Sequence, residues 1–70
     1  MTPYDIYRNW KSSLSYIAPE DTQIMMAKTT RAIRAVEEIF NQGPNTEAGA
    51  EAVEVLRKLR KFENDLRLRK

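Results

Sequence analysis

Neighbouring carboxylates are the side chains in this sequence whose types and spacing come closest to supporting acid–base chemistry. The 70-residue chain contains no histidine and no cysteine, which are the commonest proton carriers and nucleophiles. Four close pairs of acids remain: Glu20 with Asp21, Glu37 with Glu38, Glu51 with Glu54, and Glu63 with Asp65. Their spacing brings no two acids face to face inside a pocket, and the serines have no base to activate them. We therefore expect a protein that is not an enzyme and that holds no cofactor and no metal.

The acids near the C-terminus have a simpler structural role. Three pairs of opposite charges are four residues apart: Glu54 with Lys58, Glu63 with Arg67, and Asp65 with Arg69. On a helix this spacing places the two side chains side by side, where each pair stabilises the helix by about 0.2–0.5 kcal/mol. The acids are therefore expected on a solvated, charged helix face.

Basic residues form a stripe on the same segment and are the candidate site for a polyanion. Of the twelve lysines and arginines, seven lie between Arg57 and Lys70. Arg57, Arg60, Lys61 and Arg67 recur at helical spacing, opposite the apolar stripe of that helix. They could follow a phosphate backbone or meet an acidic protein surface. The third alternative is a solubilising role near the negative end of a helix dipole.

These residues are positioned by three predicted helices, at about 3–17, 19–42 and 46–68. Thr2 is a good N-cap, Pro3 suits the first helical position, and Asp5 lies where a capping-box acid belongs. Pro19 ends the first helix and opens the second. At Gly43, followed by proline, we expect a left-handed glycine to end the second helix. Asn45 or Thr46 then caps the third helix.

Apolar residues recur at spacings of three and four in every predicted helix. The stripes are Tyr7, Trp10, Leu14 and Ile17, then Met25, Met26, Thr29, Ile33, Val36 and Phe40, then Ala48, Ala52, Val55, Leu59, Phe62 and Leu66. The heptad-like steps favour a nearly antiparallel pairing of the second and third helices. The predicted fold is all-α: a long antiparallel helical hairpin with a shorter N-terminal helix packed on it. In so short a chain the core is thin, so a dimer would complete it.

A candidate partner or dimer surface follows from the apolar residues that the core does not use. Ile24, Val53 and Leu68 lie on the outer faces of their predicted helices. Tyr7 and Trp10 have two interpretations: at core spacing they anchor the first helix, and as aromatic residues they are typical of interface hot spots.

The sequence also indicates where the protein acts and which classes of function fit it. The first residues lack the basic and apolar regions of a signal peptide, and no apolar run reaches membrane-spanning length, so we expect a cytoplasmic protein with no membrane partner. The leading hypothesis is a protein–protein interaction module, a homodimer that acts as an adaptor, inhibitor or regulator of the kind found among small bacterial and phage-encoded proteins. The alternatives are a nucleic-acid-binding regulator that uses the basic stripe and a structural subunit of a larger assembly.

Overall fold

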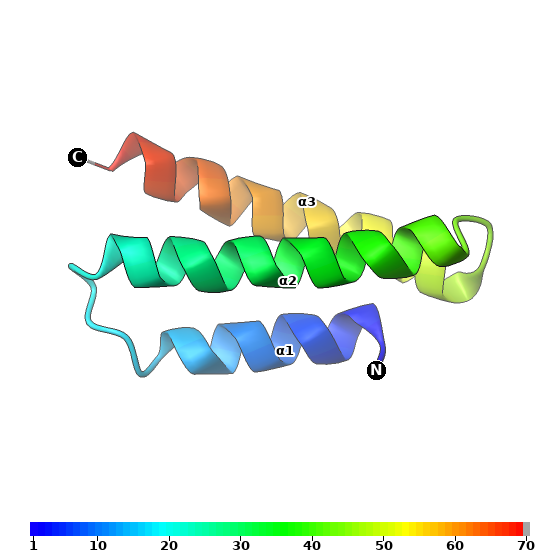
Figure 1. Ribbon diagram of the computed structural model, residues 1–70, viewed down its shortest axis with the longest axis horizontal. Coiled ribbons are helices and arrows are strands. Elements are labelled where there is room, and N and C mark those ends of the chain that lie inside the picture. Colours follow the sequence, from blue (N-terminus) through cyan, green and yellow to red (C-terminus); the bar gives the residue numbers. More distant parts are fainter. Residues whose placement is uncertain (70) are drawn as a thin grey trace.

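The chain folds into three helices that lie side by side, in the order expected from the sequence. In the computed structural model, which describes residues 1–69, they are α1 (Pro3–Leu14), α2 (Thr22–Gln42) and α3 (Glu47–Leu68). The bundle measures 38 × 21 × 14 Å. Figure 1 shows α2 and α3 as an antiparallel hairpin, with α1 antiparallel to α2. Lys70, the last of the basic residues counted above, lies outside the described residues.

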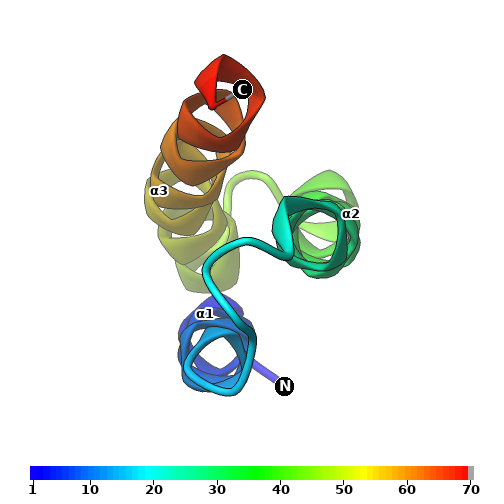
Figure 2. The same cartoon turned by 90° about the vertical axis from the view of Figure 1, so that its left-hand side faces the viewer.

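The first helix occupies one side of the hairpin. Seen end-on in Figure 2, the three helices form a triangle in which α1 lies against both α2 and α3. Because α1 and α3 both run antiparallel to α2, they are parallel to each other, and Tyr4 of α1 reaches Glu54 of α3 with a hydrogen bond of 2.7 Å. The predicted all-α fold, a hairpin carrying a shorter N-terminal helix, is confirmed.

Two helix ends differ from the sequence prediction, and both lie in the connection between α1 and α2. α1 ends at Leu14 rather than at residue 17, because serine side chains compete for the last carbonyl groups. The hydroxyl of Ser13 donates to the carbonyl oxygen of Trp10 at 2.8 Å, and that of Ser15 donates to Ser12 at 2.7 Å. α2 begins at Thr22 rather than at 19, after a turn in which the N–H of Asp21 donates to the carbonyl oxygen of Ala18.

The hairpin loop follows the prediction in position and differs in backbone conformation. α2 ends at Gln42, and the next residue, Gly43, has φ −158°, so no left-handed glycine is needed to leave the helix. Its N–H still donates to the carbonyl oxygens of Ile39 and Phe40. Thr46, one of the two predicted caps, begins α3 by accepting a hydrogen bond of 3.1 Å from the N–H of Gly49.

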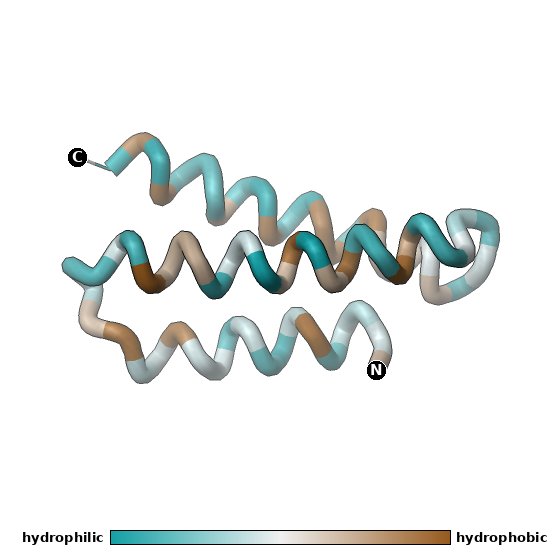
Figure 3. Tube along the Cα trace, viewed as in Figure 1, coloured by the Kyte–Doolittle hydropathy of each residue, from teal (hydrophilic) through white to brown (hydrophobic). Residues whose placement is uncertain are grey.

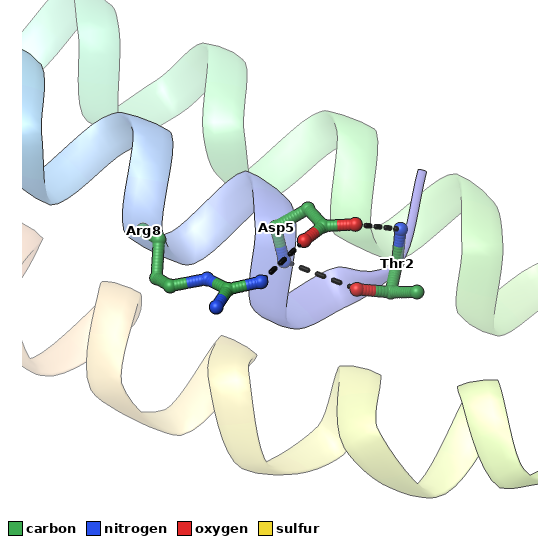
Figure 4. Close-up of polar contacts among 3 residues, drawn as sticks. All are labelled: Thr2, Asp5 and Arg8. Carbon is green, nitrogen blue, oxygen red and sulfur yellow. Dashed lines mark hydrogen bonds and ion pairs between the residues drawn. The ribbon is translucent and has the colours of Figure 1, made fainter.

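The N-terminus of α1 carries the predicted capping box. The hydroxyl of Thr2 accepts from the N–H of Asp5 at 3.1 Å, and the Asp5 carboxylate accepts from the N–H of Thr2 at 3.2 Å. Arg8, one turn along, donates to the same carboxylate at 2.5 Å (Figure 4). The N–H of Thr2, then Arg8 and the Thr2 hydroxyl, hold the pKa of Asp5 below its ordinary value. All three contacts favour the charged carboxylate.

The capping box makes the folding of α1 sensitive to acid. Because the pKa of Asp5 is lower in the folded state, its contribution is present above the ordinary aspartate pKa of about 3.9 and is lost as the pH falls through the folded value. We expect a carboxyl NMR titration to give Asp5 a depressed pKa, and Arg8→Ala to raise it only part of the way. A pKa at or above the ordinary value would show that the capping box does not form in solution.

The core follows the three predicted stripes. Figure 3 shows apolar positions recurring between polar ones along each helix. The buried apolar residues are Trp10, Met25, Ala32, Ile33, Val36, Ala52, Val55, Leu59 and Leu66. Phe40, Leu56 and Phe62 are half-buried against this cluster. Thr29 is the one buried polar residue among the described positions, and its hydroxyl has a specific role at the site described next.

Candidate functional site

An open cleft of about 320 Å³ lies between α1 and α3. Its lining combines an apolar, largely aromatic floor with a charged rim. The floor is formed by Tyr7, Trp10, Leu14 and Phe62, and the rim by Lys11, Lys58, Lys61 and Asp65. Because α1 and α3 are parallel, the lining residues of both helices follow one another in the same direction along the cleft. Tyr7 faces Lys58 at one end, and Leu14 and Asp65 each lie about two helical turns further along their helices.

Trp10 gives the cleft a rigid floor. Only 8% of this residue is exposed, and its ring meets that of Phe62 edge-to-face at 5.1 Å between centroids. The indole N–H donates to the hydroxyl of Thr29 at 2.9 Å, and that hydroxyl donates to the carbonyl oxygen of Met25 at 2.7 Å. Every buried polar group in this chain of contacts is therefore satisfied, which fixes the orientation of α1 on α2.

Tyr7 places two of the lysines at the rim. Its ring is tilted against that of Trp10, with centroids 5.6 Å apart. The ammonium groups of Lys58 and Lys11 lie over the Tyr7 ring, 5.3 and 6.0 Å from its centroid, at distances where a cation is attracted to the aromatic face. Lys58 also lies 3.9 Å from Glu54, at the limit of an ion pair. Two ammonium groups are thus held beside the apolar floor.

Glu54 of α3 also holds the N-terminal end of α1, through a hydrogen bond with Tyr4. The phenol of Tyr4 donates to the Glu54 carboxylate at 2.7 Å, and this hydrogen bond, which favours the neutral phenol, raises the pKa of Tyr4. Because the pKa is raised in the folded state, the contribution is present below the ordinary tyrosine pKa and is lost at higher pH. The contact therefore persists throughout the neutral range.

The acid pairs considered from the sequence do not assemble in the cleft. Glu37 pairs with Arg60 across α2 and α3 at 2.6 Å, and Glu63 lies 3.7 Å from Arg67. Within residues 1–69, one carboxylate oxygen of Glu51 is buried without a hydrogen-bond partner. No group of acids in the described part of the chain has an arrangement that could hold a metal ion. The expected pairs of Glu54 with Lys58 and Glu63 with Arg67 are present.

The predicted partner surface divides into separate places. Tyr7 and Trp10 come together in the cleft, where Trp10 is part of the core. Ile24, Val53 and Leu68 are 49%, 38% and 73% exposed and lie elsewhere. Ile24 is on the outer face of α2, Leu68 ends α3, and Val53 lines a groove of about 290 Å³ with Phe40 and Leu56. The five residues therefore do not form one patch.

The predicted polyanion stripe is exposed along α3, but its members face different surroundings. Lys61 lines the cleft beside α1, whereas Arg57 and Arg60 line the groove with Phe40. Arg60 is paired with Glu37, and Arg67 with Glu63. A phosphate backbone that followed the whole stripe would have to compete with these two carboxylates.

The sequence interpretation missed several residues of the cleft as site residues. They are Lys11, Leu14, Lys58, Phe62 and Asp65. The four residues of the cleft on α3 have spacings of three, four and seven from Lys58, which is the pattern of a single helix flank. That pattern was visible, but nothing in the sequence indicates which flank of α3 lies beside α1.

Two findings bear on the class of the protein. Among residues 1–69, no helix has both the length and the apolar character needed to cross a membrane. Comparisons of the chain with protein-family models, curated proteins and solved structures give no significant match.

Proposed function

We propose that this chain is a protein–protein interaction module that receives an exposed segment of a larger protein in the cleft between α1 and α3. The observation that carries the proposal is the pairing of a rigid aromatic floor, formed around Trp10 and Phe62, with a rim of lysines. Apolar pockets with a few convergent polar groups are the usual form of a recognition site. Aromatic anchors in such pockets supply most of the binding energy of protein interfaces.

The size of the cleft fits this function. A volume of about 320 Å³ is at the small end of ligand pockets, enough for one or two bulky side chains rather than for a folded domain. Burying one Leu- or Phe-sized side chain contributes about 1.5–3 kcal/mol. The rim charges then contribute orientation and rate of encounter more than affinity. A short segment of a partner, inserted by one anchor, is the occupant that these dimensions support.

The proposal predicts cross-linking from one side of the bundle. A photoreactive benzoylphenylalanine in place of Lys61, at the rim of the cleft, should capture a discrete protein when irradiated in cells of the source organism. The same residue in place of Arg31, which is exposed on α2 outside this cleft, is the matched control and should not. Excess unmodified chain should suppress the product. Identical products from both positions, or none from position 61, would contradict the proposal.

A further inference from the structure

The charges around the cleft indicate what kind of segment it receives. We propose that the occupant is an acidic segment of a protein, with one bulky apolar side chain that inserts between Tyr7 and Phe62 and carboxylates that reach the lysines of the rim. This inference rests on the proposed function and specifies the chemistry of the partner. It has three parts: the anchor, the charge of the flanking residues, and the direction in which the segment lies.

The anchor must be apolar because the floor offers almost no free polar group. The indole N–H of Trp10 is already donated to Thr29 at 2.9 Å. The remaining floor is the ring of Phe62, the ring of Tyr7 and the side chain of Leu14. Beyond the Tyr7 hydroxyl, a polar side chain inserted here would find no hydrogen-bond partner in the floor to replace the water that it loses, at a net cost. An aromatic or branched apolar side chain gains contact with the rings of Phe62 and Tyr7 and with Leu14.

The flanking residues must be acidic because the rim is predominantly cationic. Lys11, Lys58 and Lys61 face one carboxylate, Asp65. Lys11 and Lys58 are held over the Tyr7 ring, so their ammonium groups are already close to the floor. Carboxylates beside the anchor would complement these cations, whereas lysines or arginines would be repelled.

Asp65 gives the segment a direction. Since α1 and α3 are parallel, the cleft runs from the Tyr7–Lys58 end to the Leu14–Asp65 end. Lys58 and Lys11 lie over Tyr7 at the first end, with Glu54 beside Lys58 outside the lining, Lys61 lies midway, and Asp65, the acid of the lining, stands at the second end. The acids of the occupant should therefore lie mainly on the side of Lys58, with a neutral or basic residue beside Asp65.

A nucleic acid fits the same cleft less well. Single-stranded nucleic acids bind when bases stack on exposed aromatic faces. Trp10 is 8% exposed and meets Phe62 edge-to-face, which leaves little of its face free. A base could stack flat on Tyr7 only by displacing the ammonium groups of Lys58 and Lys11, which lie over its ring. The phosphates could still contact the lysines, so the test must distinguish binding of nucleic acid from binding of an acidic peptide.

The test is a binding titration of the full chain with capped hexapeptides, followed by the fluorescence of Trp10, the single tryptophan of the chain. The probe is Glu-Asp-Phe-Leu-Glu-Asp, which carries acids on both sides of the anchor so that either chain direction places some of them at Lys58; those that fall beside Asp65 are the ones that Asp65→Asn should relieve. One comparison peptide replaces Phe-Leu with Ala-Ala, and another replaces all acids with their amides. We expect the amide peptide to bind about tenfold more weakly, as loss of a few surface ion pairs predicts, and the Ala-Ala peptide to bind at least as weakly. A short DNA duplex and an oligothymidylate should not displace the acidic peptide at equal concentration.

Charge-reversal variants localise the binding. Lys61→Glu, at the rim, should weaken binding of the acidic peptide about tenfold and leave binding of the amide peptide unchanged. Arg31→Glu is the matched control: it makes the same change of charge on an exposed residue of α2 outside the cleft, and should have less than a twofold effect. Circular dichroism of both variants verifies that the helices remain folded. Asp65→Asn should strengthen binding of the acidic peptide.

The outcomes separate this inference from the proposed function. Equal binding of the acidic and amide peptides, equal effects of the two charge reversals, displacement by DNA, or no response to any peptide at about 1 mM would overturn the acidic occupant. If cross-linking from position 61 still captured a protein in any of those cases, the interaction module would stand and only the chemistry of its partner would be wrong. If cross-linking failed as well, both proposals would fall.

Discussion

Trp10→Ala should lower the free energy of unfolding by about 3–5 kcal/mol, the usual cost of removing a buried tryptophan. The change removes the edge-to-face contact with Phe62 and the contact with Tyr7, and it leaves the hydroxyl of Thr29 without its indole donor. Small domains are stable by only about 5–15 kcal/mol, so the loss is a large fraction of the total. Urea denaturation followed by far-ultraviolet circular dichroism measures it, because the variant has no tryptophan fluorescence.

Two further variants separate packing from hydrogen bonding at this position. Trp10→Phe keeps an aromatic ring against Phe62 but removes the N–H, and Thr29→Val removes the acceptor while nearly preserving volume. In a double-mutant cycle the two should couple by about 1 kcal/mol, the net worth of one buried hydrogen bond. Tyr16→Ala, at an exposed aromatic residue, is the control and should change stability by less than about 0.5 kcal/mol. A Trp10→Ala effect as small as that control would contradict the packing of α1 described above.

Gly49→Ala should also destabilise the protein, by about 2 kcal/mol or more. At an ordinary exposed helix position the same change has the opposite effect and stabilises the protein, by at most ~1 kcal/mol. Gly49 is a buried residue in the first turns of α3, where the hairpin loop folds back onto the helix. A methyl group there would overlap the carbonyl oxygen of Gly43 and lie 2.8 Å from that of Pro44. Both obstacles are backbone atoms, so no side chain can rotate to make room. Thermal or urea unfolding of the variant measures the change.

Ala50→Gly is the matched control for this prediction. Ala50 is exposed on the same turn of α3, so its replacement tests helix propensity alone and should cost at most ~1 kcal/mol. The reverse order, with Gly49→Ala more stable than the parent and Ala50→Gly less stable, would show that propensity dominates and that the loop does not press on the helix. The carbonyl groups of the loop explain why glycine occupies this one position.

Most of the fold could be predicted from the sequence because its signals are local. Thr2, Pro3 and Asp5 define the start of α1 within four residues of chain, and the apolar stripes of α2 and α3 follow from helical spacing alone. The end of α1 was missed because the competing hydrogen bonds of Ser13 and Ser15 depend on rotamers that spacing does not reveal. The pair of Asp65 with Arg69 is absent from the ion pairs of the described residues, since Arg69 has left the helix with an extended backbone.

The site was harder to predict than the fold because it depends on which face of the hairpin α1 covers. A stripe identifies the residues that point inward, but both flanks of the α2–α3 contact carry apolar side chains. Phe62 lies on the flank that α1 occupies, while Phe40 and Leu56 line the groove that contains Arg57 and Arg60. Had α1 packed there instead, Arg57 and Arg60 would line the cleft in place of Lys58 and Lys61. Tyr7 and Trp10 were identified, and their lysine neighbours were not.

The cleft exists only while α1 is docked, because one of its two walls is α1 itself. Helix α1 has 12 residues against 21 and 22 for the helices of the hairpin, and helices with small interfaces are the units that open first under native conditions. A ligand between Tyr7 and Phe62 would contact both walls and would bind only the closed form. By mass action, binding in the cleft and docking of α1 are then linked equilibria, so a bound partner stabilises the docked form of α1.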